Sequence, residues 1–212
     1  MRRPIIAREG WPFVGTLAVL AILALLVHWG LTLALAVLGL FVMWFFRDPE
    51  RPIPTEDGLV VSPADGRVMF VREVEEPRFV GGRAVMVSIF LSVFDVHINR
   101  SPVAGEVTYR EYVPGRFLAA WDESVGEVNE RSYLGLVTAC GRRVLVSQVA
   151  GLLARRIVTW PSVGDRLERG ERFGLIRFGS CTQIWLPPDS EVLVNPGDRV
   201  VGGETVIGRL PQ

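Results

Sequence analysis

The stretch from Gly10 to Phe46 contains no Asp, Glu, Lys or Arg, and this constrains the fold more than any other feature. As a single helix it would be about 55 Å long, whereas the hydrocarbon core of a bilayer is about 30 Å thick. His28-Trp29-Gly30 divides it into Trp11–Val27 and Leu31–Phe46, each near the lower limit of about 17 residues for a span. We therefore expect residues 1–46 to form a membrane-associated hydrophobic helical hairpin with its turn at His28–Gly30.

Arginines flank this segment on both sides, which predicts its orientation. Arg2, Arg3 and Arg8 precede the segment, and Arg47 and Arg51 follow it. Positive residues concentrate on the cytoplasmic side of membrane segments, so we expect the cell (inner) membrane, with the remainder of the chain on the cytoplasmic face. A cleaved signal peptide is the alternative, but two apolar halves follow each other without a small-residue cleavage site between them and the body.

Beyond the hairpin the pattern changes to β-structure. A proline-rich connector covers residues 47–58, and short runs rich in Val, Ile, Phe and Tyr, broken by Gly or Pro, follow in residues 59–212. The expected strands are Leu59–Ser62, Arg67–Val71, Ala84–Ser92, Gly105–Tyr112, Leu134–Ala139, Arg143–Val149 and Arg155–Trp160. The soluble part is therefore predicted to be mainly β.

Two internal repeats refine this prediction. Ser62–Val68 and Ser101–Val107 share the pattern S-P-x-x-G-x-V, and Gly164–Glu171 and Gly197–Glu204 share G-D-x-[VL]-x-x-G-E. Repeated glycines at strand corners suggest two related β-halves wrapped around each other. The second pattern resembles the turns of biotinyl- and lipoyl-carrier domains, so we expect a barrel-sandwich-like β domain.

The composition excludes several kinds of chemistry. All 23 basic residues are arginine, so a lysine Schiff base to pyridoxal phosphate and a lysine tether for biotin or lipoate are both excluded. The 23 acidic residues balance the charge, and we expect no nucleic-acid partner and no metal. The two cysteines, Cys140 and Cys181, form no disulfide framework and suit a reducing compartment, although a single structural disulfide stays open.

Three polar positions could carry chemistry. Ser180 follows Gly179 between two apolar runs, Phe173–Phe178 and Ile184–Leu186, where a Gly-Ser pair most often marks a plain hairpin turn. His97 follows an apolar run and could equally be a half-buried strand residue, and Asp65 could equally be a turn residue. A histidine can move protons, a carboxylate can fix its tautomer and a hydroxyl can then become a nucleophile, but the spacing of these three residues alone does not unite them in one site.

Six blocks of sequence, in the same order, resemble the short prokaryotic form of phosphatidylserine decarboxylase proenzymes, and the resemblance covers essentially the whole chain. Phe178-Gly179-Ser180 resembles the self-cleavage site of that family. The other blocks are Phe46–Arg51, Ser62–Gly66, Phe94–Pro102, Asn129–Arg131 and Gln148–Ile157.

The resemblance implies a pyruvoyl enzyme that makes its own cofactor. Ser180 would attack the carbonyl of Gly179, with His97, oriented by Asp65, as the base, and β-elimination would split the chain into a β-chain 1–179 and an α-chain 180–212. These chains would stay together as a heterodimer whose oligomeric state the sequence leaves open. Ser180 would become the pyruvoyl group, which forms a Schiff base with phosphatidylserine and accepts electrons as carbon dioxide leaves, giving phosphatidylethanolamine.

The substrate's phosphate and carboxylate suit arginine, and the positions in matching blocks are Arg100, Arg131, Arg155 and Arg156. The chain departs from the family pattern at Cys181 and Gln183, where an arginine and a carboxylate often stand. It also has Arg100 where longer members carry a second histidine, so proton transfers would depend on His97 alone.

Two other functions fit part of the sequence. A membrane-anchored hydrolase would use the same Asp65, His97 and Ser180 while keeping an intact chain, although a peptidase nucleophile motif is absent. A non-enzymatic barrel-sandwich adaptor would explain the hairpin and the repeats, but gives no reason for these three residues to coexist.

Overall fold

The structure is a computed structural model that describes residues 5–118, 125–152, 156–177 and 180–211. The chain divides into two compact units, Met1–Glu50 and Arg51–Gln212, which are described separately below.

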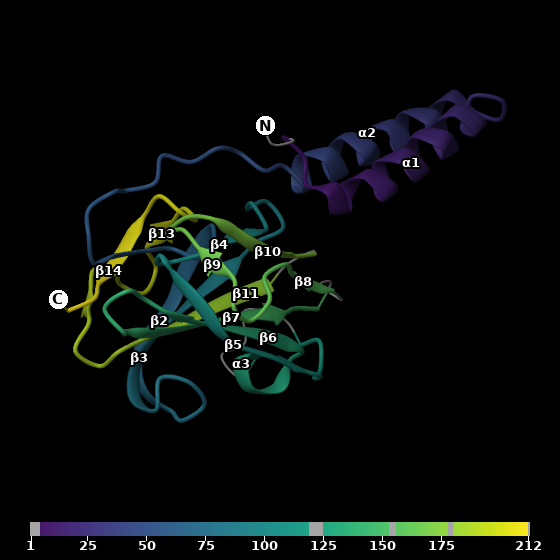
Figure 1. Ribbon diagram of the computed structural model, residues 1–212. Helices are drawn as coiled ribbons and strands as arrows, with labels where there is room; N and C mark the ends of the chain where they lie inside the picture. Colours follow the sequence, from purple (N-terminus) through teal and green to yellow (C-terminus); the bar gives the residue numbers. More distant parts are fainter. Residues whose placement is uncertain (1–4, 119–124, 153–155, 178–179, 212) are drawn as a thin grey trace. The chain divides into compact units, whose positions relative to one another are not determined.

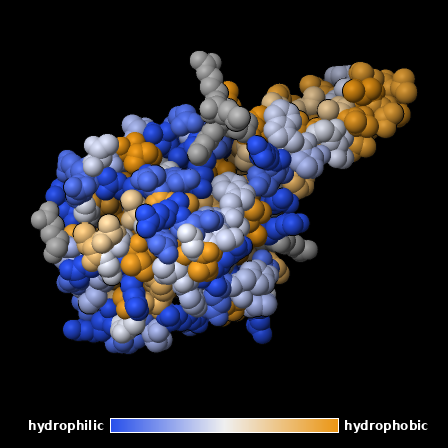
Figure 2. Space-filling view, viewed as in Figure 1, coloured by the Kyte–Doolittle hydropathy of each residue, from blue (hydrophilic) through white to orange (hydrophobic). Residues whose placement is uncertain are grey.

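The first unit is a helical pair, as predicted. A 3-10 turn, η1 (Arg8–Gly10), leads into α1 (Trp11–Ala24), and α2 (Trp29–Phe45) packs antiparallel against α1. Its ends are tied together, because Ala7 N donates to Phe46 O at 2.8 Å. Leucine, valine and tryptophan side chains cover the outside of the pair, whose surface is largely hydrophobic in Figure 2. Among the described residues, no helix combines the length and the apolar character needed to cross a membrane.

The turn of the helical pair lies earlier than we predicted. Residues 25–28 connect the helices, and His28 is the N-cap of α2. The His28 Nδ1 atom accepts a hydrogen bond from Gly30 N at 3.1 Å, which satisfies one of the free amides of the first turn. Trp29 and Gly30 are therefore helical, so the turn begins three residues and ends two residues before the predicted His28–Gly30.

The second unit is mainly β (Figure 1), and the fourteen strands among its described residues form three sheets. One sheet has the order β13-β2-β3-β11-β7-β6-β5-β9 and curls into a half-barrel; β4-β10-β8 and β1-β14-β12 are smaller sheets. The strands are β1 (Leu59–Val61), β2 (Gly66–Glu76), β3 (Gly82–Leu91), β4 (Ile98–Arg100), β5 (Gly105–Val113), β6 (Arg131–Val137), β7 (Arg143–Ala150), β8 (Ile157–Thr159), β9 (Arg166–Leu167), β10 (Arg172–Ile176), β11 (Ser180–Leu186), β12 (Glu191–Val192), β13 (Arg199–Val200) and β14 (Val206–Arg209), with one helical turn, α3 (Val125–Val128).

The central strands of the curled sheet, β6, β7 and β11, are buried on both faces. Because side chains alternate along a strand, Ile184 and Leu186 of β11 join the main core inside the curl, whereas Trp185 packs outside it against Tyr133 and Phe79. Aliphatic residues dominate the inner core, which also takes side chains from both small sheets. The fold class, a mainly β barrel-like domain with an N-terminal helical pair, is therefore confirmed.

The repeated sequences adopt the same local structure in both halves. Ser62 Oγ donates to Ala64 O at 2.6 Å, and Ser101 Oγ donates to Val103 O at 2.7 Å. Each S-P-x-x-G-x-V segment then pairs with one G-D segment, so that β13 lies on β2 and β9 lies on β5. These pairs form the two edges of the curled sheet.

The Gly-Ser pair does not form a hairpin. Strand β10 before it pairs with β4 and β8, whereas β11 after it pairs with β3 and β7 in the large sheet. The chain therefore passes from one sheet to another between Ile176 and Ser180, and Ser180 is itself the first residue of a strand.

Candidate active site

Ser180 is the first residue of β11, which lies between β3 and β7 in the middle of the curled sheet. It pairs with Leu91 at the end of β3 and with Ala150 at the end of β7, and its exposed fraction is 0%. Its hydroxyl has no hydrogen-bond partner among the described residues. A buried hydroxyl without a partner is uncommon, because it costs stability. Its presence here makes Ser180 a candidate functional residue.

His97 is held against the segment that leads to Ser180. After Leu91, the chain makes a turn over residues 92–97, and the His97 carbonyl accepts a hydrogen bond from Ile176 N at 3.2 Å. The turn thus begins beside Ser180 and ends beside Ile176, which precedes Ser180 by four residues in the chain. Gly179 itself lies outside the described residues.

The orientation of the His97 ring is set by the main chain. His97 Nδ1 lies 2.9 Å from the carbonyl oxygen of Asp95, and the residue is 3% exposed. Because a carbonyl oxygen only accepts, Nδ1 carries the proton and Nε2 is the basic nitrogen of the neutral ring. This is the tautomer that a general base needs.

Asp95 is a site residue that the sequence analysis missed. Its carboxylate, 4% exposed, accepts from Ser92 N at 2.9 Å, from Ser92 Oγ at 2.7 Å and from Arg199 at 2.7 Å. These bonds fix the turn whose main chain orients His97. Asp95 lies in the Phe94–Pro102 block, two residues before the histidine, and an Asp that closes a short turn was the available signal.

Asp65 lies in a turn bonded to the strand after His97. Arg100 N donates to Pro63 O at 2.9 Å, which joins the turn to β4. Asp65 Oδ2 accepts from Arg51 at 2.9 Å, and Oδ1 accepts from Gly202 N at 2.8 Å. Both bonds favour the ionised carboxylate.

A buried chain of polar side chains lies on the inner face beside Ser180. Thr182, two residues along β11, accepts from Asn99 at 3.0 Å, and Gln148 donates to Asn99 at 2.8 Å. Thr159 continues the chain by donating to Gln148 at 2.7 Å. It therefore cross-links β11 and β7 of the large sheet to β4 and β8 of the small one.

The arginines differ in their environment. Arg100 is buried and donates to Gly170 O at 3.0 Å, while Arg131 is buried and donates to Tyr133 Oη, Glu127 O and Asn129 O, each at 2.9 Å. Arg156 is exposed, and its carbonyl accepts from Arg177 N at 3.2 Å. Arg155 lies outside the described residues.

The two residues that depart from the family pattern point away from Ser180's side chain. Cys181 and Gln183 lie on the outer face of β11, where Cys181 Sγ is 3.1 Å from Ser88 Oγ. Burial raises the pKa of the Cys181 thiol to about 11, so it is neutral at physiological pH. Both cysteines are free, and the described part of the chain holds no group of three metal-ligating side chains.

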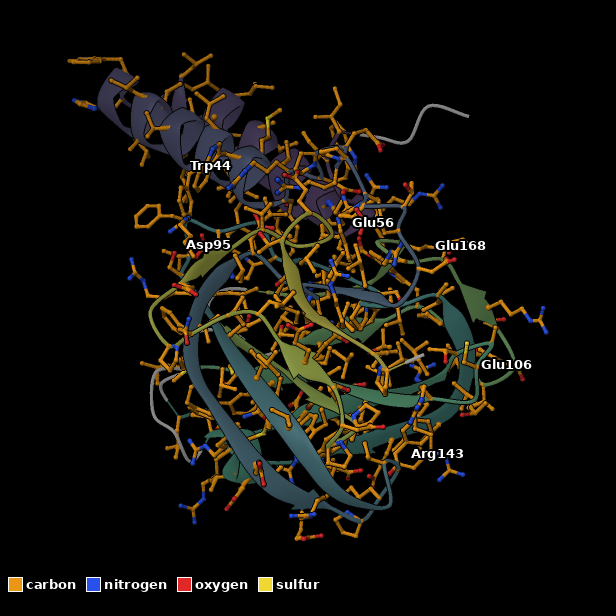
Figure 3. The ribbon with its side chains drawn as sticks, turned by 90° about the vertical axis from the view of Figure 1, so that its left-hand side faces the viewer. Trp44, Glu56, Asp95, Glu106, Arg143 and Glu168 are labelled. Atoms are coloured by element: carbon orange, nitrogen blue, oxygen red, sulfur yellow. The ribbon has the colours of Figure 1, made fainter. Side chains whose placement is uncertain are left out.

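The site occupies one end of the large sheet. Asp95 lies near that end and Arg143, at the start of β7, lies at the other (Figure 3). A surface groove of about 790 Å³ is lined by residues such as Pro54, Ala139 and Arg142, so it lies toward the Arg143 end. It is separate from Ser180.

Ser180, His97 and Asp65 are thus the candidate catalytic positions, and comparison with known proteins gives the family to which the chain belongs. The family model for phosphatidylserine decarboxylase matches residues 38–208. The chain therefore belongs to the phosphatidylserine decarboxylase family, which is a family of carboxy-lyases, and the predicted resemblance is confirmed.

Individual relatives match over nearly their full length. The chain is 86% identical to a phosphatidylserine decarboxylase proenzyme of Symbiobacterium thermophilum, over 100% of this chain and 99% of the relative. It is 48% identical to the proenzyme of Carboxydothermus hydrogenoformans, over 99% of both chains. It is 44% identical to that of Burkholderia ambifaria, over 99% of this chain and 98% of the relative.

Proposed function

We propose that this chain decarboxylates phosphatidylserine to phosphatidylethanolamine, after it has split itself between Gly179 and Ser180. Membership of the family supports the reaction, and the relatives are named as proenzymes. The observation that carries the self-processing step is the Ser180 hydroxyl, which is fully buried and has no partner among the described residues.

The processing reaction needs a nucleophile and a base. We propose that His97 Nε2 removes the proton of Ser180 Oγ as this oxygen attacks the carbonyl carbon of Gly179, which converts the amide into an ester. Loss of the Cα proton of residue 180 then breaks its Cβ–Oγ bond. The oxygen leaves with Gly179 as a carboxylate, and water hydrolyses the remaining dehydroalanine to a ketone and ammonia.

Three groups support His97 in this scheme. The Asp95 carbonyl oxygen accepts a hydrogen bond from His97 Nδ1–H and so stabilises the positively charged ring that forms when Nε2 becomes protonated. Arg199 holds the Asp95 carboxylate and with it the turn. We assign to Asp65 the role of the carboxylate that stabilises a positively charged His97, because its turn is bonded to β4 and its bond to Arg51 keeps it ionised.

The chain fits a pyruvoyl group at residue 180. The position is buried and flanked by Leu91 and Ala150, which excludes water from most sides. A pyruvoyl ketone supplies an electron sink for a substrate amine, which a chain without lysine would otherwise lack. His97 would then deliver or remove protons at the head-group carbon, and the exposed Arg156, with Arg155, is the candidate for the lipid's phosphate or carboxylate. Arg100 and Arg131 would support the site through their buried bonds.

The two chains would remain together after cleavage. The α-chain 180–212 contributes β11, which lies between β3 and β7 of the β-chain 1–179, and β14, which pairs with β1. Separating them would expose fully buried residues such as Ile184 and Leu186. We place the enzyme at the inner face of the cell membrane, with the hairpin 1–46 as its attachment, the connector 47–58 after it and the catalytic domain over 59–212.

The test uses the full chain in vesicles with phosphatidylserine labelled at the carboxyl carbon. We expect release of labelled carbon dioxide, and an α-chain one ammonia lighter than a fragment that begins with serine. A carbonyl reagent such as phenylhydrazine should abolish the release, and Ser180→Ala should give an intact, inactive chain. A split chain whose α-chain retains the mass of serine, or release that survives the carbonyl reagent, would contradict the proposal.

A further inference from the structure

Large apolar side chains are exposed around the Ser180 end of the β unit. Phe94 is 65% exposed, Leu152 is 57% exposed and Leu118 is 37% exposed. Single exposed apolar residues need no explanation, but a group of them marks a binding surface. We call these three residues the apolar rim.

The strand pairing places Phe94 and Leu152 on opposite sides of Ser180. Leu91 and Ala150 both pair with Ser180, and because neighbouring strands are about 4.8 Å apart these two residues are about 10 Å from each other. Phe94 follows Leu91 by three residues and Leu152 follows Ala150 by two. Both therefore lie in loops that leave the same end of the sheet.

Leu118 joins this group through Asn129. The Asn129 side chain accepts from Leu118 N at 2.9 Å, donates to Leu118 O at 3.0 Å and donates to Ala150 O at 2.7 Å. This fully buried amide fixes Leu118 beside the strand end that flanks Ser180. The rim is thus held by the same backbone that positions the site.

Exposed arginines accompany the rim. Arg116 lies two residues before Leu118, and Arg156 is bonded through its carbonyl to Arg177 N, directly before the crossing to Ser180. Apolar side chains with nearby basic ones match the interface of a bilayer that contains anionic lipid, because apolar groups enter the acyl boundary and arginine meets the phosphates.

We propose that the apolar rim docks the β unit directly onto the bilayer, with Phe94, Leu118 and Leu152 inserted around the end of the sheet at which Ser180 lies. This rests on the proposed function, since a lipid substrate must bring its head group to a buried residue. The hairpin would keep the enzyme at the membrane, and the rim would orient the site toward it. This second contact is independent of the hairpin.

The direct test measures insertion residue by residue. The fluorophore NBD is attached at Phe94→Cys or Leu152→Cys in the full chain carrying Cys140→Ser, since Cys181 is buried and Cys140 exposed. Val163→Cys is the matched control, because Val163 is 61% exposed and the neighbouring Gly164 bonds to Val107 at the far end of the sheet. The proteins are reconstituted into phosphatidylcholine–phosphatidylglycerol vesicles with or without doxyl-labelled lipid.

We expect doxyl lipid to quench the labels at 94 and 152 strongly and the label at 163 little. Equal quenching at all three positions would overturn the proposal. So would a blue-shifted label at 94 that doxyl lipid does not quench, because the hairpin or a second copy of the chain would then cover the rim.

An activity comparison separates docking from catalysis. The double variant Phe94→Ser/Leu152→Ser should decarboxylate phosphatidylserine in vesicles about tenfold more slowly than the control Val163→Ser/Leu193→Ser. The reason is that two large side chains, each a little more than half exposed, would no longer bury apolar surface in the bilayer. A dissolved short-chain phosphatidylserine should be decarboxylated equally by both. If decarboxylation in vesicles is normal but the labels at 94 and 152 are not quenched, docking by the apolar rim is refuted and the proposed function stands. If these labels are quenched but no phosphatidylserine is decarboxylated, the proposed function is refuted and docking stands.

Discussion

Ser180 and Cys181 are consecutive residues of β11, both with an exposed fraction of 0%, yet their surroundings differ. Cys181 points outward into an apolar cluster with Val125 and Val149, and its thiol lies beside Ser88 Oγ. Ser180 points inward at the end where the crossing from β10 arrives, and its hydroxyl has no partner among the described residues. Two residues of one strand that are equally buried therefore differ in their surroundings, because they lie on opposite faces of the sheet.

The inner face itself changes character along β11. Ile184 and Leu186 lie in the aliphatic core, while Thr182 and Ser180 lie among polar side chains. A rigid apolar core at one end of a strand thus supports a polar site at the other. The comparison of the two faces and two ends leads to four predictions.

The largest effect is expected for His97, the base proposed for the inner face. His97→Ala should slow splitting of newly made chain at least about 100-fold, because the loss of a general base has this magnitude. The rate is measured by denaturing electrophoresis after cell-free synthesis. His28→Ala, which changes the other histidine, is the control and should split at the wild-type rate; equal rates for both variants would exclude His97 as the base.

A smaller effect is expected for the turn that orients His97. Asp95→Ala removes the acceptor for Ser92 and Arg199 and should slow splitting about tenfold, as for a misplaced catalytic group. Asp95→Asn keeps an acceptor oxygen and should restore most of the rate. If Asn is as slow as Ala, the negative charge rather than the hydrogen bonding is what the site needs.

Neighbouring residues of β7 extend the comparison to stability. Gln148→Leu should lower the free energy of unfolding by about 2 kcal/mol, because it removes the hydrogen-bond donor of the buried Asn99 Oδ1 atom and the acceptor of the Thr159 hydroxyl, which keeps its contact with Ser132. Ser147→Ala, on the outer face, should be nearly neutral because its buried hydroxyl has no partner among the described residues. The free energies are measured by urea unfolding, with each change made in a Ser180→Ala background so that the chain stays whole. Equal losses of free energy for the two variants would refute a stabilising role for the network.

The smallest effect concerns the thiols. Iodoacetamide at pH 8 should label exposed Cys140 and spare Cys181, whose pKa burial raises to about 11. Because the folded pKa lies above the unfolded value of 9.0, the contribution of the buried neutral thiol to stability should be lost as pH rises from about 9 to 11. Mass spectrometry of the peptides measures the extent to which each cysteine is labelled. Labelling of Cys181 in the folded chain would contradict the described burial.

The sequence predicted the fold class well because strand runs and repeats are local. The runs near Arg67, Ala84, Gly105 and Arg143 are strands in the structure, and the repeats form matching edges of the large sheet. It could not predict the short strand β4 or that β10 and β11 belong to different sheets, since both depend on pairing between distant segments.

The candidate site was predicted in part. Motif blocks gave the positions of Ser180, His97 and Asp65, whose catalytic roles stay predictions. The carboxylate of Asp95 could have been recognised as closing a turn, but the contact between its main-chain carbonyl and His97 could not, because no side-chain pattern marks it. The network through Gln148 was also missed, since alternation shows which residues share a face only after strand bounds are known.

The most direct test of the central claim compares Ser180→Ala with Cys181→Ala by mass spectrometry of the denatured full chain. Our account predicts that the Ser180→Ala chain stays whole, while Cys181→Ala splits after Gly179 and yields an α-chain one ammonia lighter than a serine-initiated fragment. If the Ser180→Ala chain still splits at this bond, or if Cys181→Ala folds but stays whole, the inward hydroxyl of β11 is not the group that processes this protein.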